Sequence, residues 1–199
     1  YRQLFLIQAI ISAMSFSAIP TALLYFCNDS KTLLVKWNYI KSIFILVLVL
    51  GLLIAGGVYF ARELIALAFS NNRLADALKS FALVPLATML VSMLASVFIV
   101  IDKTSMQVKV AAFISLIKVV SVIVVAFVYG SFQAILTTTV FANLAVGFFA
   151  IYLMGRLGYL YKLKLPVFKL FVPRLWLYSF PLLLASGASV LGLKIDHLI

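Results

Sequence analysis

Lys118 is the residue of this sequence whose position most demands a chemical explanation. It lies near the middle of a long apolar stretch, about Val108 to Val128. At the midplane of a lipid bilayer, insertion scales assign a charged Lys a cost of about 2.5 to 3.5 kcal/mol. In a helix, Ala111, Ser115 and Ser121 would share its face, because they recur at spacings of three and four residues. Such a face belongs inside a helix bundle.

Two roles fit this small and weakly polar face. Lys118 could form the cationic wall of a water-filled cavity that accepts an anionic group. It could equally be a buried Lys that is held by hydroxyls and backbone carbonyls or kept neutral. The residue types leave both roles open, and we take Lys118, Ser115 and Ser121 as candidate residues of a substrate cavity.

A second polar face lies in the stretch from about Phe132 to Met154. Thr139, Asn143 and Gly147 follow one another at spacing four, so a helix places them on one side. An Asn inside a spanning helix usually joins helices by hydrogen bonds, and contact with a substrate is the alternative. Thr139 and Asn143 complete the set of cavity candidates.

Polar residues near the two ends of the sequence are easier to explain by structure. Lys194 follows Arg174 by 20 residues, which is roughly 30 Å along a helix and places Lys194, Asp196 and His197 at an outer helix end. A proton-linked role for His197 is the alternative. Pro20, inside the first apolar stretch, removes a backbone hydrogen bond and predicts a helix kink.

The residues needed for catalysis are scarce. Five carboxylates, one His and one Cys are too few and too scattered for a metal cluster or a nucleophilic triad. Glycine-rich nucleotide and phosphate motifs do not occur in the sequence. The single Cys27 excludes an internal disulfide, and we expect it to pack. We therefore expect no enzymatic activity, no metal and no cofactor.

Apolar stretches fill most of the 199 residues and must position these side chains. The composition is 66% hydrophobic and 11% charged, with a mean hydropathy of +1.23. A helix needs roughly 20 apolar residues to cross a bilayer, and the alternation of a β-barrel is absent. We predict an all-α, polytopic membrane helix bundle. Its six spans are Leu4 to Phe26, Ser42 to Ala61, Phe81 to Ile101, Val108 to Val128, Phe132 to Met154, and Leu175 onward.

Loop charge predicts the orientation of these spans, because short cytoplasmic loops carry an excess of Lys and Arg. The loops after the first, third and fifth spans hold ten Lys and Arg residues and the opposite side holds four, so the first set is placed in the cytoplasm. The ten are Lys31, Lys36, Lys41, Lys103, Lys109, Arg156, Lys162, Lys164, Lys169 and Arg174; the four are Arg2, Arg62, Arg73 and Lys79.

Two connections have distinctive compositions. Residues 155 to 173 alternate basic and aromatic residues, a pattern that can bind single-stranded nucleic acid. Between two spans it fits better on the cytoplasmic face, where anionic lipid attracts each cation by roughly 1 kcal/mol. We expect contact with membrane lipids and none with nucleic acid. Residues 62 to 79 mix charged and apolar residues and predict a partly amphipathic segment at the outer interface.

Two sequence features predict contacts between helices. Gly51, Ala55, Gly56 and Gly57 offer a small-residue surface for close helix packing. The turn signal at residues 129 to 133 is so short that the spans on either side should be antiparallel neighbours.

Several short motifs resemble one family of transporters. The opening Tyr-Arg-Gln-Leu-Phe (1–5) looks like the end of that family's first outer loop, and Ile-Pro-Thr-Ala-Leu-Leu-Tyr-Phe (19–26) like the close of its second helix. Tyr-Ser-Phe-Pro-Leu-Leu-Leu-Ala-Ser-Gly (178–187), followed by Lys-Ile-Asp-His-Leu-Ile (194–199), is similar to the start of its second lobe. On these motifs the chain resembles the O-antigen and capsule-type polysaccharide flippases of the multidrug/oligosaccharidyl-lipid/polysaccharide exporter superfamily. His197 stands where that family usually has Arg, so no role of that Arg carries over.

The resemblance implies an organisation and an activity. Residues 1–154 would be an incomplete first lobe, 155–174 a basic cytoplasmic linker, and 175–199 the first helix of a second lobe, which makes the sequence an excerpt covering helices two to seven. Two lobes would rock about a central cavity and move a polyprenyl-diphosphate-linked oligosaccharide across a bacterial inner membrane. A cationic cavity suits the diphosphate, and Lys118 fits that role by residue type. Other polysaccharide-assembly proteins would be possible partners.

Two other functions remain in competition. A drug or small-molecule exporter of the same superfamily more often needs an intramembrane carboxylate, and the spans have no central Asp or Glu. A membrane-embedded polysaccharide polymerase or acyltransferase would need a sizeable outer loop with His, Arg or carboxylate groups, and no outer loop here has one.

Overall fold

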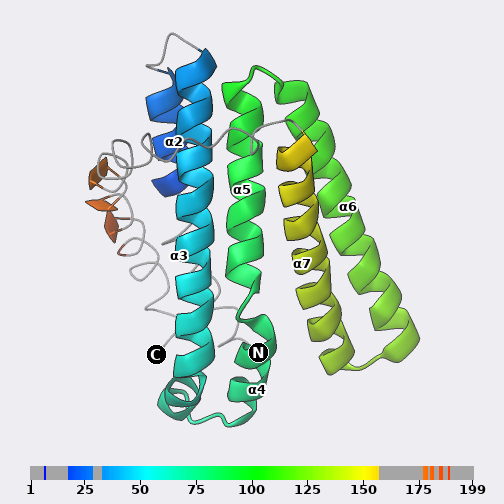
Figure 1. Ribbon diagram of the computed structural model, residues 1–199. Helices are drawn as coiled ribbons and strands as arrows, with labels where there is room; N and C mark the ends of the chain where they lie inside the picture. Colours follow the sequence, from blue (N-terminus) through cyan, green and yellow to red (C-terminus); the bar gives the residue numbers. More distant parts are fainter. Residues whose placement is uncertain are drawn as a thin grey trace.

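The structure is a bundle of long α-helices, as the composition predicts, and the described residues contain no strand. It is a computed structural model that describes residues 18–28 and 33–156, with isolated positions at 7, 177, 178, 180, 181, 184, 185 and 188. The helices are α2 (Ala18–Asn28), α3 (Leu33–Ala68), α4 (Arg73–Phe81), α5 (Val84–Val100), α6 (Thr104–Tyr129) and α7 (Phe132–Arg156). Figure 1 shows α3, α5 and α7 side by side, with α6 beyond α7.

Four helical segments are long and apolar enough to cross a membrane, so the protein is a multi-pass membrane protein. They are residues 35–68, 73–100, 104–129 and 133–156. They correspond to the second, third, fourth and fifth predicted spans. Most of the first span, all but two residues of the linker at 155–174, and most of the sixth span lie outside the described residues, as do Lys194, Asp196 and His197.

Helix α3 is much longer than the span predicted within it. It covers 36 residues, from Leu33 to Ala68, which is roughly 54 Å along its axis against a hydrocarbon core of about 30 Å. Residues 62 to 68, the first part of the predicted interfacial segment, continue α3 without a break, because nothing in that stretch breaks a helix. Helix α4 is the amphipathic second part of that segment and buries Leu74, Leu78 and Phe81, and its place at the outer interface stays a prediction.

The helix ends explain where the chain turns. Helices α3 and α5 each end in a left-handed residue, Ser70 (φ 49°) and Asp102 (φ 56°). After α5, the amide of Lys103 donates to the carbonyl of Phe98 at 2.8 Å, and this satisfies a carbonyl at the helix end. Gly130 (φ 57°) ends α6 in the same conformation, inside the predicted turn. Helices α6 and α7 are therefore the antiparallel neighbours that the short turn predicts.

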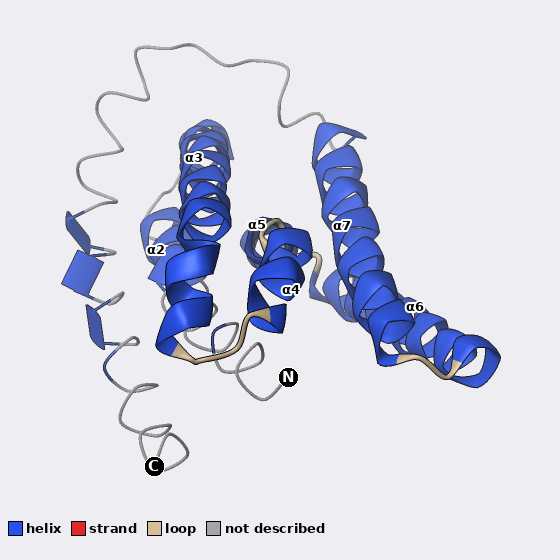
Figure 2. Ribbon diagram, turned by 90° about the horizontal axis from the view of Figure 1, so that it is seen from below, coloured by secondary structure: helices blue, strands red, loops and turns tan. Residues whose placement is uncertain are grey.

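Helix α5 lies at the centre of the bundle and contacts α2, α3, α6 and α7. Figure 2, viewed from one end, shows α5 between the group of α2 and α3 and the pair of α6 and α7. The main core cluster joins α2, α3, α5 and α7 through large side chains that include Leu23, Ile43, Met93, Phe98 and Met154. A second cluster lies around α4 and the start of α5.

Two glycines allow the neighbouring helices to approach α5 closely. A methyl group added at Gly51 of α3 would overlap Leu86, whose Cα lies 3.3 Å away. A methyl group added at Gly147 of α7 would lie 2.9 Å from the Cβ of Ala87. Leu86 and Ala87, which are adjacent in α5, thus pack against α3 and α7. The predicted small-residue surface of α3 is narrower than expected, because added Cβ atoms at Gly56 and Gly57 would meet nothing within 4 Å.

Candidate functional site

The candidate site is a hydrogen-bonded pair that joins α6 to α7. The ammonium nitrogen of Lys118 donates to the side-chain oxygen of Asn143 at 2.7 Å. Asn143 is 7% exposed, and Lys118 is half-buried. Both residues are in spanning helices that otherwise hold no charged side chain near this depth. The pair is therefore a cation held within the apolar part of the bundle.

Asn143 is oriented by its own helix. Its side-chain nitrogen donates to the carbonyl of Thr139 at 2.7 Å, one turn earlier. The hydroxyl of Thr139 in turn donates to the carbonyl of Ile135 at 2.8 Å. With the amide nitrogen engaged by the backbone, the amide oxygen is turned toward Lys118. A neutral amide oxygen accepts a hydrogen bond from the ammonium without cancelling its charge.

The ammonium keeps donors available. A Lys has three N–H donors, and Asn143 takes one of them. Among the residues that the structure describes, the other two have no hydrogen-bond partner. The arrangement can therefore bind a further acceptor or an anion.

The two serines predicted to share the face of Lys118 do not contact its ammonium. The hydroxyl of Ser121 donates to the backbone carbonyl of Lys118 at 2.9 Å, inside α6. Ser115 is exposed. Of the five cavity candidates, the structure thus brings together Lys118, Asn143 and Thr139, while the two serines lie beside them on α6.

The pair lies midway along the membrane-spanning helix. Lys118 is the 15th of the 26 residues of α6, roughly 21 Å from the first residue along a helix of about 39 Å. Around it, α6 exposes large apolar side chains on most of its surface; Leu116, Val120, Val124 and Phe127 are among them. These faces suit hydrocarbon, so the site is a polar contact between two helices that are otherwise apolar.

Other polar residues of the spans have simpler surroundings. Thr88, Ser92 and Ser96 of α5 donate to carbonyls of their own helix. Pro20 lies near the start of α2, and because residues 8 to 17 are outside the described residues the predicted kink stays a prediction. Within the described part of the chain, no group of three or more His, Cys, Asp or Glu residues could hold a metal ion.

The pairing of Lys118 with Asn143 was not predicted, although a signal for it exists in the sequence. The two residues lie 12 and 13 positions from Gly130, on opposite sides of the turn. In an antiparallel helix pair, residues equally distant from the turn lie at the same depth. The symmetry about Gly130 could therefore have placed the amide opposite the ammonium.

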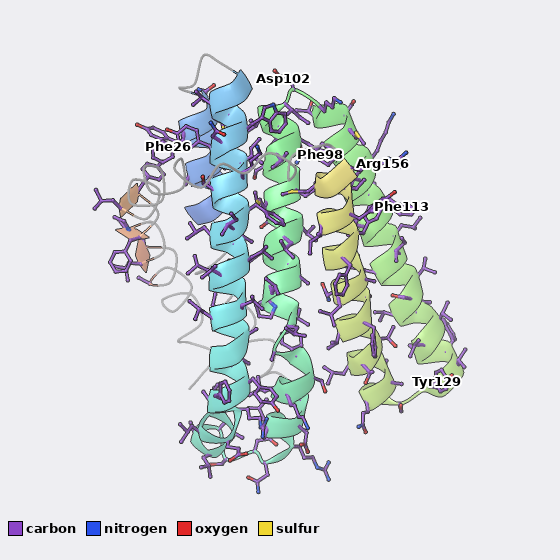
Figure 3. The ribbon with its side chains drawn as sticks, in the orientation of Figure 1. Phe26, Phe98, Asp102, Phe113, Tyr129 and Arg156 are labelled. Atoms are coloured by element: carbon purple, nitrogen blue, oxygen red, sulfur yellow. The ribbon has the colours of Figure 1, made fainter. Side chains whose placement is uncertain are left out.

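A separate pocket, also missed by the sequence, lies at one end of the bundle. It has a volume of about 750 Å³ and is not lined by Lys118 or Asn143. Asp102 lines it, and Figure 3 shows Asp102 at the same end as Phe26 and Phe98, with Tyr129 at the opposite end. The ten-to-four count of Lys and Arg predicts that this end faces the cytoplasm.

Comparison with known proteins gives one result that covers almost the whole chain. A family model described as "Polysaccharide biosynthesis protein" matches residues 4–199. No curated protein and no solved structure matches the chain significantly.

Proposed function

This chain belongs to the polysaccharide biosynthesis protein family, and from that membership we propose that it transports a lipid-linked oligosaccharide across a bacterial cytoplasmic membrane. The cargo would be a polyprenyl-diphosphate-linked repeat unit, flipped from the inner to the outer leaflet by alternating access. Family membership and the four apolar spanning helices support a membrane role in polysaccharide biosynthesis. The direction of transport and the identity of the cargo go beyond family membership and belong to the proposal.

The observation that carries this proposal is the Lys118–Asn143 pair at mid-membrane depth. A polyprenyl diphosphate carries negative charge that must pass through a region where isolated charge is costly. An ammonium with two donors free among the described residues offers a partner along that path. Hydrogen bonds to charged groups are shorter and roughly twice as strong as neutral ones. The pair therefore supports an anionic cargo better than a neutral or cationic drug.

The position of Lys118 on α6 also supports transport. Helix α6 packs against α7 and against one side of α5, and its remaining surface is apolar and exposed. Residues 1–154 would form the first lobe, and a second lobe beginning near residue 175 would meet it across the cavity. In this arrangement Lys118 faces a cavity that opens to one side of the membrane at a time.

A cell-based experiment tests the function itself. In a strain that requires this protein for surface polysaccharide, depletion should stop the appearance of surface glycan while lipid-linked repeat units accumulate. Converting spheroplasts to inverted vesicles should show that the accumulated glycan faces the cytoplasm. Accumulation on the periplasmic face would place the protein after translocation, for example in polymerisation, and would overturn the proposal.

A further inference from the structure

The pocket at the Asp102 end is built from four separate segments of the chain. Its volume of about 750 Å³ falls within the roughly 300 to 1,000 Å³ of typical small-molecule sites. The last two turns of α2 form one wall, with Lys36 of α3 and the end of α5 opposite. The lining residues that the structure describes are Thr21, Leu24, Tyr25, Cys27, Asn28, Lys36, Ile99, Val100, Asp102 and Tyr178.

Aromatic rings form one side of this pocket. The rings of Tyr25 and Tyr178 stack with centroids 4.8 Å apart, and Phe26 contacts Tyr178 edge-on at 5.7 Å. Phe26 is itself stacked on Tyr39 at 5.4 Å, which connects the group to the core. Tyr25 remains 56% exposed. The electron-rich face of such a ring suits the polarised C–H groups on one side of a sugar ring.

The polar lining offers both donors and acceptors. Lys36 can only donate, Asp102 can only accept, and Asn28 can do both. A ligand with several hydroxyls can use all of them, because each hydroxyl both donates and accepts.

The charges of the described lining residues do not favour an anion over a neutral ligand. Among the lining residues that the structure describes, Lys36 is the one cation and Asp102 the one carboxylate, so their charges balance. A phosphate or diphosphate would meet the like charge of Asp102. The polar and aromatic groups together favour an uncharged, polyhydroxylated ligand.

We propose that this pocket binds an uncharged sugar ring on the cytoplasmic side of the membrane. The proposal rests on the transport function above, and it identifies the pocket as the place where the glycan part of the cargo is recognised. Asp102 precedes Lys118 by 16 residues, roughly 24 Å along a helix. Sugar recognition and charge binding would thus occur at two different sites.

Direct binding to the purified full chain in nanodiscs tests the pocket without any transport step. The probes are the methyl glycosides of glucose, galactose and N-acetylglucosamine, measured by saturation-transfer NMR, with inorganic pyrophosphate as the competitor. Tyr25→Ala should weaken glycoside binding roughly 2- to 12-fold, the range expected for loss of one ring contact. Asp102→Asn should weaken it about fivefold, since a neutral acceptor replaces a charged one.

Two features of the variants show whether a loss of glycoside binding comes from the pocket itself. Asn tolerates the left-handed backbone of position 102 (φ 56°), so Asp102→Asn keeps the turn intact. Phe60→Ala removes an aromatic ring of α3 that is 83% exposed and does not line the pocket, and it should leave binding unchanged.

Several results would overturn the proposal. These are no glycoside signal, an equal signal from protein-free nanodiscs, displacement by pyrophosphate, or an equal loss in Phe60→Ala. If no glycoside binds but the protein still translocates lipid-linked glycan, this inference fails and the transport function stands. If glycosides bind but translocation is absent, the transport function fails instead.

Discussion

Replacing Lys118 by Met should abolish most glycan export without unfolding the protein. Met keeps the length of the side chain and removes the charge and the bond of 2.7 Å to Asn143. A hydrogen bond to a charged group contributes about 1.5 to 3 kcal/mol. In the proposed function, Lys118 also donates a hydrogen bond to the anionic cargo. If the rate-limiting state of transport contains that bond, its loss should lower export roughly 10- to 150-fold.

A double-mutant cycle with Asn143→Leu separates transport from packing. If the pair only joins α6 to α7, Lys118→Met leaves the buried Asn143 oxygen unsatisfied, at a cost of about 1 to 3 kcal/mol. Replacing both partners by apolar residues would then restore stability and export together. If Lys118 binds the cargo, the double variant regains stability but not export.

The assay measures surface glycan by antibody or lectin, membrane abundance by immunoblot, and thermal stability in detergent. Lys109→Ala is the matched control, since it removes a charge from an exposed position near the start of the same helix. Lys118→Arg should retain part of the export because it retains the charge. Normal export in Lys118→Met, or recovery of export in the double variant, would refute the cargo-binding role.

Further predictions concern topology and packing. In a variant lacking the native cysteine, Ser131→Cys between α6 and α7 should react with a membrane-impermeant thiol reagent in intact cells. Lys103→Cys should react only after permeabilisation. The reverse pattern of labelling would show that the predicted orientation is wrong. Gly147→Val should destabilise the protein by about 1 to 3 kcal/mol, because even a Cβ at this position would lie 2.9 Å from α5. Gly57→Ala should be neutral or stabilise the helix by up to about 1 kcal/mol, because a Cβ at this position meets nothing within 4 Å. Equal thermal stabilities of Gly147→Val and Gly57→Ala would contradict the close packing of α7 on α5.

The spans that the sequence predicted best have local markers at their ends. Pro85 lies in the first turn of α5, and Gly130 adopts the left-handed turn after α6. The length of helix α3 was underestimated because the apolar run stops at the charge of Arg62, whereas the helix continues to Ala68. A charge limits the apolar run, but only a residue that breaks the backbone pattern ends a helix.

The two sites differ in how far sequence could predict them. Lys118 and Asn143 could each be found from a polar residue in an apolar stretch, and their depth follows from the turn between them. The pocket could not be predicted in this way. Tyr25, Lys36 and Asp102 belong to three different segments with no shared periodicity, and only the packing of α2 and α3 on α5 brings them together.

Translocation by the purified full chain in proteoliposomes tests the central claim most directly. The substrate is a polyprenyl-diphosphate-linked oligosaccharide, and the readout is the fraction of its glycan that a membrane-impermeant glycosidase can reach over time. The wild type should translocate the substrate at a rate at least about tenfold above that of Lys118→Met, and Lys109→Ala should be close to the wild type. Equal rates for the wild type and Lys118→Met, or no translocation above protein-free vesicles, would contradict the central claim.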